Sequence, residues 1–373
     1  MMWPGKHVGR WLAPCLLQAV TRRPPRPRDG RAVHVLFCFV DHFEPTRPEQ
    51  VEAWLERYPK LTARHRDSDG VPPQHTWFFP GEQYRAEYLE ALTTFARQGL
   101  GEVELHLHHH YDTSATLRER IQTAVENFGR HGALVTRGEP GLVTYGFIHG
   151  NMALDNSMGD PRWCGVDNEL DVLRETGCFA DFSMPTAPAV SQTRTINAIY
   201  YAVDDPTAPR SHDRGVRARV GMTDREGLLI IQGPLALDWR RRRFGLLPGV
   251  DNAEIMRRYP GTPERVRRWV RQHVHVAGRP EWIVVKVSCH GAEERHFGAL
   301  LGDDAEQLHA HIEARFRDRP GYRLHYVTAR ELYNVVKAAE AGHDGDPGRF
   351  RDFRIPPYLN REAVVVPGHG HDR

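Results

Sequence analysis

Hydrophobic and polar residues follow two periods along the chain, and these periods predict a succession of strands and helices. Short apolar runs rich in β-branched and aromatic residues predict buried strands, whereas apolar positions three and four residues apart predict helices. Strands are expected over residues 33–40, 75–79, 102–107, 143–148, 178–182, 282–288 and 322–327. Helices are expected over residues 49–58, 83–97, 116–128, 166–175, 263–273, 305–317 and 329–341. This alternation favours an α/β fold whose parallel strands are joined by helical crossovers.

The alternation of strands and helices breaks between residues 197 and 239. Two predicted strands, 198–203 and 228–232, flank a loop rich in Pro, Asp and Arg. We interpret residues 197–232 as a β-hairpin insertion that helps to form a wall of a substrate site, with a plain surface hairpin as the alternative.

The chain divides into three predicted parts. Residues 1–31 are expected to form a leader followed by a Pro- and Arg-rich linker. Residues 32–342 are expected to form the folded α/β unit, and residues 343–373 an irregular C-terminal tail whose histidine-rich end is disordered.

The leader contains the apolar run Trp11–Val20, which follows Lys6 and Arg10. Such a run is too short to span a bilayer, and no small-residue cleavage site follows it. It is compatible with an amphipathic segment that contacts a membrane peripherally.

Charge and cysteine content narrow the functional classes. The net charge of +2 gives no field that would favour nucleic acid, and we interpret the basic run Arg240–Arg243 as a solvated surface. None of the five cysteines forms a C-x-x-C pair, and their spacing does not suggest a disulfide framework. A reducing compartment fits this pattern, so we expect a cytoplasmic protein, with membrane association left open.

The stretch Glu104–Asp112 holds four histidines within five positions, and imidazole is the commonest metal ligand among side chains. If the strand continues, His106, His108 and His110 share one face. If the chain turns helical after Leu107, His106 and His110 become neighbours one turn apart. Both geometries bring His106 and His110 to the same side, and a histidine-rich surface loop is the alternative.

Other polar residues follow predicted strands. Asp41 and His42 come after the first strand, His149 and Asn151 after strand 143–148, and His290 after strand 282–288. The carboxyl ends of parallel strands meet at one edge of a sheet, where the sites of such folds lie. The alternative for Asp41 is a cap on the following turn.

In order and type, Asp41, the pair His106-x-x-x-His110 and the late His290 resemble the NodB-type polysaccharide deacetylases of the carbohydrate esterase group. Asp238-Trp239 is similar to an Asp-Trp motif of that family. The resemblance covers roughly residues 33–330.

Two further stretches, 149–157 (HGNMALDNS) and 162–165 (RWCG), are similar to an uncharacterised branch of this superfamily. Proteins of that branch resemble parts of exopolysaccharide or capsule biosynthesis clusters. Two positions depart from the family pattern. His42 stands where the family has a second aspartate, and the Arg-x-Pro-Tyr motif has no match in this chain.

The resemblance implies a distorted (β/α)7-type barrel, similar to a TIM barrel, that removes acetyl groups from a saccharide or glycan precursor in exopolysaccharide or cell-surface glycan biosynthesis. It implies a divalent metal, Zn²⁺ before others, held by His42, His106 and His110. Asp41 would act as the base and His290 as the acid. The side chains implied in substrate binding are those of His149, Asn151, Asp181, Asp238 and Trp239.

Three alternatives stay open. His106-Leu107-His108 is also an H-x-H pair, as in amidohydrolases and related metal-dependent phosphoesterases. A glycoside hydrolase on the same kind of barrel would need two neighbouring carboxylates, and the candidates are Asp41, Glu44, Glu104, Asp181 and Asp238. A non-catalytic saccharide-binding relative is the third alternative.

Overall fold

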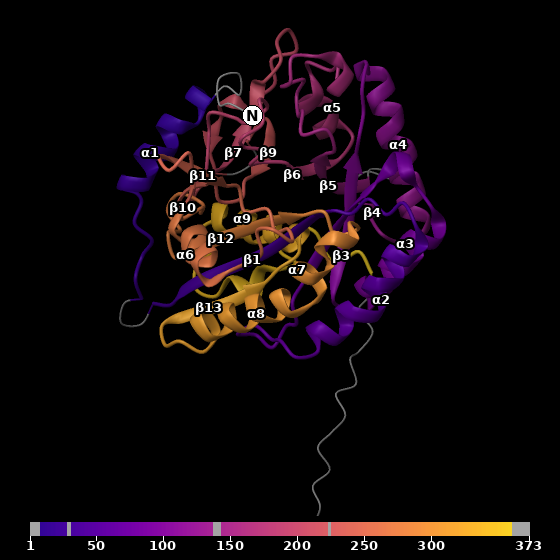
Figure 1. Ribbon diagram of the computed structural model, residues 1–373. Helices are drawn as coiled ribbons and strands as arrows, with labels where there is room; N and C mark the ends of the chain where they lie inside the picture. Colours follow the sequence, from indigo (N-terminus) through magenta and orange to yellow (C-terminus); the bar gives the residue numbers. More distant parts are fainter. Residues whose placement is uncertain (1–7, 28–30, 137–142, 223–224, 360–373) are drawn as a thin grey trace, which may run out of the picture.

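The computed structural model describes residues 8–27, 31–136, 143–222 and 225–359 (Figure 1). The strands are β1 (Val33–His42), β2 (His75–Pro80), β3 (Gly101–Leu107), β4 (Val135–Thr136), β5 (Val143–His149), β6 (Cys178–Asp181), β7 (Ile199–Ala202), β8 (Val216–Arg217), β9 (Leu228–Ile231), β10 (Ala236–Arg243), β11 (Leu247–Asp251), β12 (Trp282–Cys289) and β13 (Tyr322–Tyr326). The helices are α1 (Leu12–Thr21), α2 (Pro48–Thr62), α3 (Ala86–Arg97), α4 (Ser114–Arg130), α5 (Glu169–Glu175), α6 (Pro263–Arg271), α7 (Phe297–Leu301), α8 (Asp303–Ile312) and α9 (Ala329–Glu340). The predicted α/β class is confirmed.

The main sheet is mostly parallel. Its strands run in the order β12-β1-β2-β3-β5-β6-β9-β7-β8, with β13 beside β1 and β4 beside β5. The pairs from β12 through to β9 are parallel, whereas β7 pairs antiparallel with both β9 and β8. The parallel strands therefore end at one common edge, and the predicted strand pair at residues 198–203 and 228–232 forms the antiparallel part.

The central strand β1 is buried on both faces, and its side chains alternate between two cores. Val35, Phe37 and Phe39 join the larger core under the outer helices. Cys38 and Val40 join the second core on the other face. This continuous apolar run is typical of a parallel strand covered on both sides.

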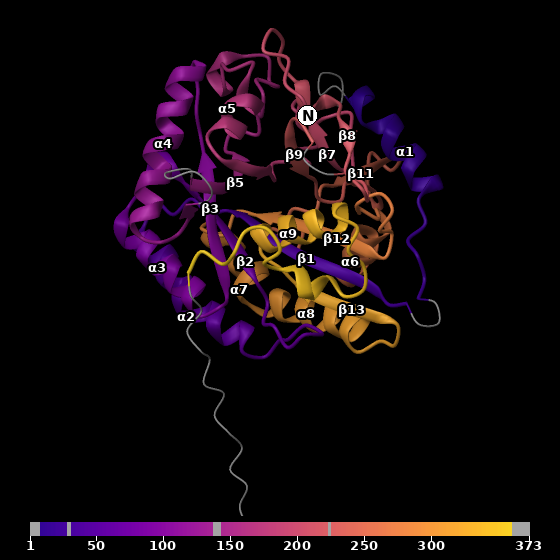
Figure 2. The same ribbon diagram turned by 180° about the vertical axis from the view of Figure 1, so that it is seen from behind.

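Helix α9 covers that second face. Its apolar residues pack with β1, β9 and β12 side chains in the second core, and both views place the helix in the middle of the molecule (Figures 1 and 2). Thr328 caps the helix by accepting a hydrogen bond from the Glu331 N–H. Helix α9 thus packs in the second core, whereas α2, α3, α4 and α8 pack in the larger core.

A separate two-stranded sheet, β10–β11, was not predicted from the sequence. Helix α1 packs on it through Trp11 and Cys15, which join Leu235 and Leu237 in a third, small core. In the part of the chain that the structure describes, no helix is long and apolar enough to cross a bilayer.

All five cysteines are free and buried. The division of the chain at residues 31 and 342 stays a prediction. Residues 343–359 hold a short helical turn, Pro347–Phe350, and Tyr358 reaches back to Glu104. The histidine-rich end of the predicted tail lies outside the described residues.

The carboxylate of Glu104 is fully buried beneath the sheet edge. It accepts hydrogen bonds from the Tyr358 hydroxyl (2.6 Å) and the Gly146 N–H (2.6 Å). Burial raises the pKa of Glu104 to about 8, because desolvation outweighs these two hydrogen bonds. The folded protein therefore holds a proton on this side chain at pH values where the unfolded chain has lost it.

We predict that Glu104 makes the folded protein less stable as pH rises. Its stabilisation is complete below the ordinary carboxyl pKa of 4.5 and is lost as pH approaches about 8. Within this pH window, one such group lowers the unfolding free energy by up to about 1.4 kcal/mol per pH unit. Glu104→Gln keeps the shape and removes the titration, so its unfolding free energy, measured with denaturant from pH 5 to 8, should fall less steeply than that of the wild type. Parallel curves for the two proteins would contradict the prediction.

Candidate metal centre at the carboxyl edge of the sheet

Four histidines and one glutamate meet where β1, β3 and β12 end. The rings of His42 and His290 stack with centroids 4.8 Å apart. His106 contacts His42 edge-on at 4.9 Å and His108 at 4.6 Å. Glu44 completes the group, which we call the edge cluster. It is assembled from three chain segments that the sheet topology brings together.

Strand alternation explains why these side chains converge. His42 ends β1 and follows Cys38 and Val40 on the face turned toward α9. His106 lies in β3, and His108 follows the strand by one residue. Residues two apart on an extended chain share a face, so His106 and His108 both reach the same place.

Glu44 lies between two of the imidazoles. One of its oxygens, Oε1, is 3.0 Å from Nε2 of His106 and 3.6 Å from Nε2 of His108. The other nitrogen of His106, Nδ1, is 3.1 Å from the carbonyl oxygen of Ile148 and must donate to it. A neutral His106 therefore turns a lone pair on Nε2 toward a carboxylate oxygen. Two acceptors at this distance require a proton or a cation between them.

Two further carboxylates hold the outer histidines. Nδ1 of His108 is 2.6 Å from Glu82, which lies in the short turn Gly81–Gln83 after β2. Nδ1 of His290 is 3.3 Å from Glu254. Carboxylates that bind the far nitrogen of a histidine and so fix its ring are typical of metal sites.

His42 differs from the other three histidines. It is buried, and its Nδ1 has no hydrogen-bond partner among the residues that the structure describes. Burial lowers the pKa of His42 well below its ordinary value, and the neighbouring His290 and His106 act in the same direction.

The neighbouring carboxylates raise the pKa values of His290 and His108. Burial alone would lower the pKa of His290, but Glu254 outweighs it and the pKa is raised. Burial would likewise lower the pKa of His108, and Glu82 and Glu44 together raise it. The pKa of Glu44 is lowered, because the hydrogen bond and charge of His106 outweigh desolvation.

The donor set fits a divalent cation. Ligand atoms of Glu44, His106 and His108 all lie within 4.8 Å of one another, as do those of His42, Glu44 and His290. Imidazole and carboxylate donors suit Zn²⁺ and related first-row ions. Glu44 belongs to both sets and is the residue on which a bound ion would centre.

The structure places His110 outside this group. Its side chain is exposed and its ring lies edge-on to Tyr111 at 6.2 Å. The structure therefore pairs His106 with His108 and not with the predicted His110, because β3 ends at Leu107 and the alternation of the strand does not extend to His110.

Asp41, predicted as the base, points to the opposite side of β1 from His42. Its carboxylate is fully buried and accepts a hydrogen bond from the Gly291 N–H (2.6 Å) and pairs with Nε2 of His75 (2.8 Å). His75 starts β2 and was not singled out from the sequence. Asp41 is thus placed as a link between strands rather than as a side chain that faces the edge cluster.

The predicted substrate-binding residues are spread over three places. His149 is buried in a separate group with His109, and Asn151 donates through Nδ2 to the His109 carbonyl (2.8 Å). Asp181 accepts from the Ser183 hydroxyl (2.7 Å), and burial raises its pKa to about 6.

The dipeptide Asp238-Trp239 lies on β10. Asp238 is buried and binds Tyr259 (2.6 Å) and Arg268 (2.8 Å). Trp239 is about half exposed and lines a groove beside α1. These contacts give Asp238 a structural role in holding the β10–β11 sheet against α6.

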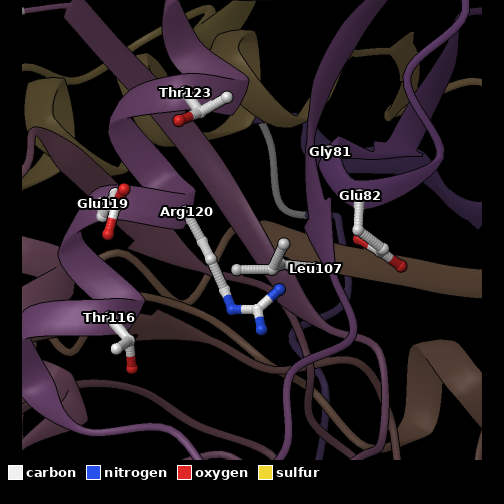
Figure 3. A pocket seen from close by; sticks show the side chains of 7 residues that line it. All are labelled: Gly81, Glu82, Leu107, Thr116, Glu119, Arg120 and Thr123. Atoms are coloured by element: carbon white, nitrogen blue, oxygen red, sulfur yellow. The ribbon is translucent and has the colours of Figure 1, made fainter.

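Two hollows adjoin the edge cluster. One of about 520 Å³ opens beside His290 and Glu254 and is lined by several arginines and glutamates. The other, of about 370 Å³, lies between α4 and the turn after β2 (Figure 3) and is lined by Glu82, the partner of His108, but by no residue of the cluster itself. Leu107 and Arg120 are among its lining residues. Of these two hollows, the one beside His290 is therefore the one that a residue of the edge cluster lines.

Comparison with known proteins gives no family assignment. No protein-family model matches the chain, and no curated protein matches it significantly.

We predict that Gly291 cannot be replaced by alanine without loss of stability. A Cβ at this position would lie 2.0 Å from Oδ2 of Asp41 and 2.8 Å from the Trp54 ring. Gly291→Ala should lower the unfolding free energy by about 1–3 kcal/mol, because the buried carboxylate must move away from its partners. The matched control is Gly298→Ala in α7, whose Cβ meets nothing within 4 Å. It should stay within about 1 kcal/mol of wild type, and equal losses in both variants would contradict the prediction.

Proposed function

We propose that this protein is a metal-dependent hydrolase that removes acetyl groups from a saccharide or glycan precursor, in exopolysaccharide or cell-surface glycan biosynthesis. The observation that carries the proposal is Glu44 facing the Nε2 atoms of His106 and His108, at the carboxyl edge of a parallel sheet. The acetylated saccharide as substrate rests on the resemblance of Asp41, His106 and His290 to the NodB-type family. It is compatible with the open hollow beside His290.

The fold we propose for this activity is a distorted (β/α)7-type barrel. Support comes from contacts between segments at opposite ends of the parallel strand order. Nζ of Lys286, on β12, donates to the carbonyl oxygens of Phe182 and Met184, which follow β6. The Gly233 N–H, after β9, donates to the same Met184 carbonyl (3.0 Å). Such contacts are those that closure of the sheet requires.

In this proposal Glu44, His106 and His108 hold the metal ion, with Zn²⁺ as the best-suited candidate. The ion would lower the pKa of a water molecule from 15.7 to roughly 7 and polarise the acetyl carbonyl group. Glu82 and the Ile148 carbonyl keep the two imidazoles turned toward Glu44. This assignment replaces the predicted ligand His110 by His108 and the predicted ligand His42 by the carboxylate of Glu44.

The stacked pair His42 and His290 supplies the proton transfers. Nδ1 of His42 has no hydrogen-bond partner among the described residues and accepts the proton of the attacking water. His290, held at Nδ1 by Glu254, protonates the leaving amine or alcohol. His42 thereby takes the base role that the resemblance gave to Asp41, since the Asp41 carboxylate is engaged by Gly291 and His75.

A second candidate function has one specific observation in its favour. His106 and His108, rather than His106 and His110, lie side by side, and an H-x-H pair is typical of amidohydrolases and related metal-dependent phosphoesterases. Phosphate release without acetate release by the purified protein would favour that class.

The proposal predicts separate effects on metal content and turnover. Zinc per chain should fall by one equivalent in His106→Ala and in His108→Ala, because each change removes a ligand. His110→Ala is the matched control and should keep the wild-type content. His42→Gln should also keep the metal, yet reduce acetate release from N- and O-acetylated oligosaccharides by about 10²-fold or more. Metal analysis and an acetate assay provide the two readouts.

Two outcomes would overturn the proposal. Loss of zinc in His110→Ala with retention in His108→Ala would return the ligand role to His110. Retention of full zinc content in His106→Ala and His108→Ala, after circular dichroism has shown both variants folded, would remove the metal site itself.

A further inference from the structure

A second group of metal-binding side chains lies apart from the edge cluster and takes no part in the proposed reaction. It consists of His109, His149, Cys164 and Glu169, all fully buried. His149 and Cys164 lie in the two stretches, 149–157 and 162–165, whose sequences are similar to an uncharacterised branch of the deacetylase superfamily. We call this group the inner cluster.

The distances within the inner cluster are those of a coordination sphere. Oε1 of Glu169 is 3.0 Å from Nε2 of His109 and 3.8 Å from Nε2 of His149, and Oε2 is 3.4 Å from Sγ of Cys164. One ligand atom from each of the four lies within 4.8 Å of all the others. Metal–ligand bonds of about 2.0–2.3 Å in a tetrahedron place the ligand atoms roughly 3.3–3.8 Å apart.

Two buried ring nitrogens of the inner cluster, Nδ1 of His109 and Nε2 of His149, have no hydrogen-bond partner among the residues that the structure describes. Nε2 of His149 makes no hydrogen bond with any residue that the structure describes, although the ring is fully buried. The N–H groups of Asn151 (3.2 Å) and Ala153 (3.5 Å) donate to its Nδ1, so the neutral ring carries its proton on Nε2, which lies 3.8 Å from Oε1 of Glu169. A buried polar atom without a partner needs an explanation, and an ion among these ligands supplies one.

The surroundings of the inner cluster also fit a cation. Asp112 lies 3.5 Å from Nδ1 of His109, as a carboxylate does behind a metal-bound imidazole. The thiolate of Cys164 and the carboxylate of Glu169 together balance the charge of a divalent ion.

We propose that His109, His149, Cys164 and Glu169 bind a structural zinc ion. Four protein ligands leave no position open for substrate, as in structural rather than catalytic zinc sites. The ion would cross-link the segment after β3, the segment after β5 and the start of α5. Binding displaces the protons on Sγ of Cys164 and on Nε2 of both histidines, so affinity should increase with pH.

Cobalt substitution tests this site independently of the proposed function. Co²⁺ bound to a thiolate gives an intense near-ultraviolet charge-transfer band, and the edge cluster contains no cysteine. Purified full-length protein reconstituted with Co²⁺ should show the band. It should disappear in Cys164→Ser and persist in His106→Ala. Cys178→Ser, which changes another buried cysteine, is the matched control and should keep the band.

The outcomes separate the two sites. Absence of the band in the wild type, or its survival in Cys164→Ser, would overturn the structural zinc site and leave the edge cluster untouched. If Cys164→Ser does not fold, Glu169→Gln removes one ligand charge and should lower cobalt affinity at least tenfold. Unchanged affinity in that variant would also overturn the proposal.

A different observation concerns the tip of the β10–β11 hairpin. Phe244 and Gly245 lie in the three-residue connection between β10 and β11, and both have positive φ values, 51° and 70°, a conformation that favours Gly and Asn. A bulky aromatic residue in this conformation is strained by roughly 1–2 kcal/mol. Phe244 is nevertheless 85% exposed, and Leu246 is 81% exposed. Burial of these side chains within the protein does not offset the strain. The strained and exposed apolar tip therefore indicates a contact with another molecule or surface.

Charge and apolar surface combine around this tip. Arg240, Arg241 and Arg242 are exposed on the strand that leads to it. A groove of about 680 Å³ separates β10 and α6 from α1, whose Leu17 and Val20 are also exposed. The run Arg240–Arg243, interpreted from the sequence as a solvated surface, thus flanks a protruding apolar tip.

We infer that the hairpin tip and the exposed face of α1 dock on a membrane surface rich in anionic phospholipid. Apolar side chains that enter the interface and arginines that meet the headgroups are the two contributions such binding needs. This extends the peripheral membrane contact expected of the N-terminal segment to a second element, and it does not rest on the proposed function.

Vesicle co-sedimentation tests the docking surface. The protein should sediment with vesicles of phosphatidylglycerol and phosphatidylcholine, less so at high salt, and remain free of vesicles of phosphatidylcholine alone. The double variant Phe244→Asn/Leu246→Asn should bind at least tenfold more weakly, because both apolar side chains leave the interface. Asn suits the turn, so this variant should fold at least as well as the wild type.

The matched control is Val203→Asn, which changes an exposed apolar residue on another surface and should bind like the wild type. Equal binding by the double variant and the control, or no binding to anionic vesicles, would overturn the inference. Loss of vesicle binding in Arg240→Gln/Arg242→Gln, together with unchanged binding in Phe244→Asn/Leu246→Asn, would show that binding depends on the arginines alone. That result would overturn insertion of the tip.

Discussion

The carboxylate of Asp41 is the interaction on which the sheet edge depends. It is fully buried, and it joins β1 to His75 of β2 and to the Gly291 N–H after β12. A buried charge that loses its partner costs about 3–5 kcal/mol, so these three segments are held in one register. Gly291 lets the backbone approach, and its carbonyl oxygen accepts from the Trp54 indole (2.8 Å).

That register also decides where the chemistry lies. Since Asp41 points to the face that the outer helices cover, His42 must point to the face turned toward α9, where it meets His106 and His290. The end of β1 therefore carries the edge cluster on one face, through His42, and the link between strands on the other face, through Asp41. The family resemblance placed Asp41 and His42 in one site because it compares the types and order of residues. It contains no information on the direction of a side chain, so it could not assign Asp41 to the link between strands and His42 to the edge cluster.

Strand ends were predictable because buried parallel strands are short, apolar and bounded by polar residues. The sequence accordingly located His42, His106 and His290 at the correct edge. The choice between His108 and His110 depended on where extended backbone ends, and the sequence offered both geometries. Glu82 and Glu254 lie far along the chain from the histidines they hold, and no local pattern connects them.

Other features were missed because their signal is conformational. The β10–β11 hairpin has a phenylalanine where hairpin turns favour asparagine or glycine, so its turn was not recognised. The inner cluster draws on residues 109, 149, 164 and 169, whose spacing matches no common metal motif. Only the folded chain shows that a cysteine and a glutamate reach the same buried point.

The histidine stretch at the end of β3 contributes to both clusters, because the side chains of successive residues point in alternating directions. His106 and His108 face the edge cluster, whereas His109 faces the inner cluster. Substitutions in this stretch therefore act on one cluster at a time, but a change of length acts on both. Insertion or deletion of a single residue between Leu105 and His109 would exchange the faces of the histidines that follow. This segment should consequently tolerate little variation in length during evolution, even where individual side chains vary.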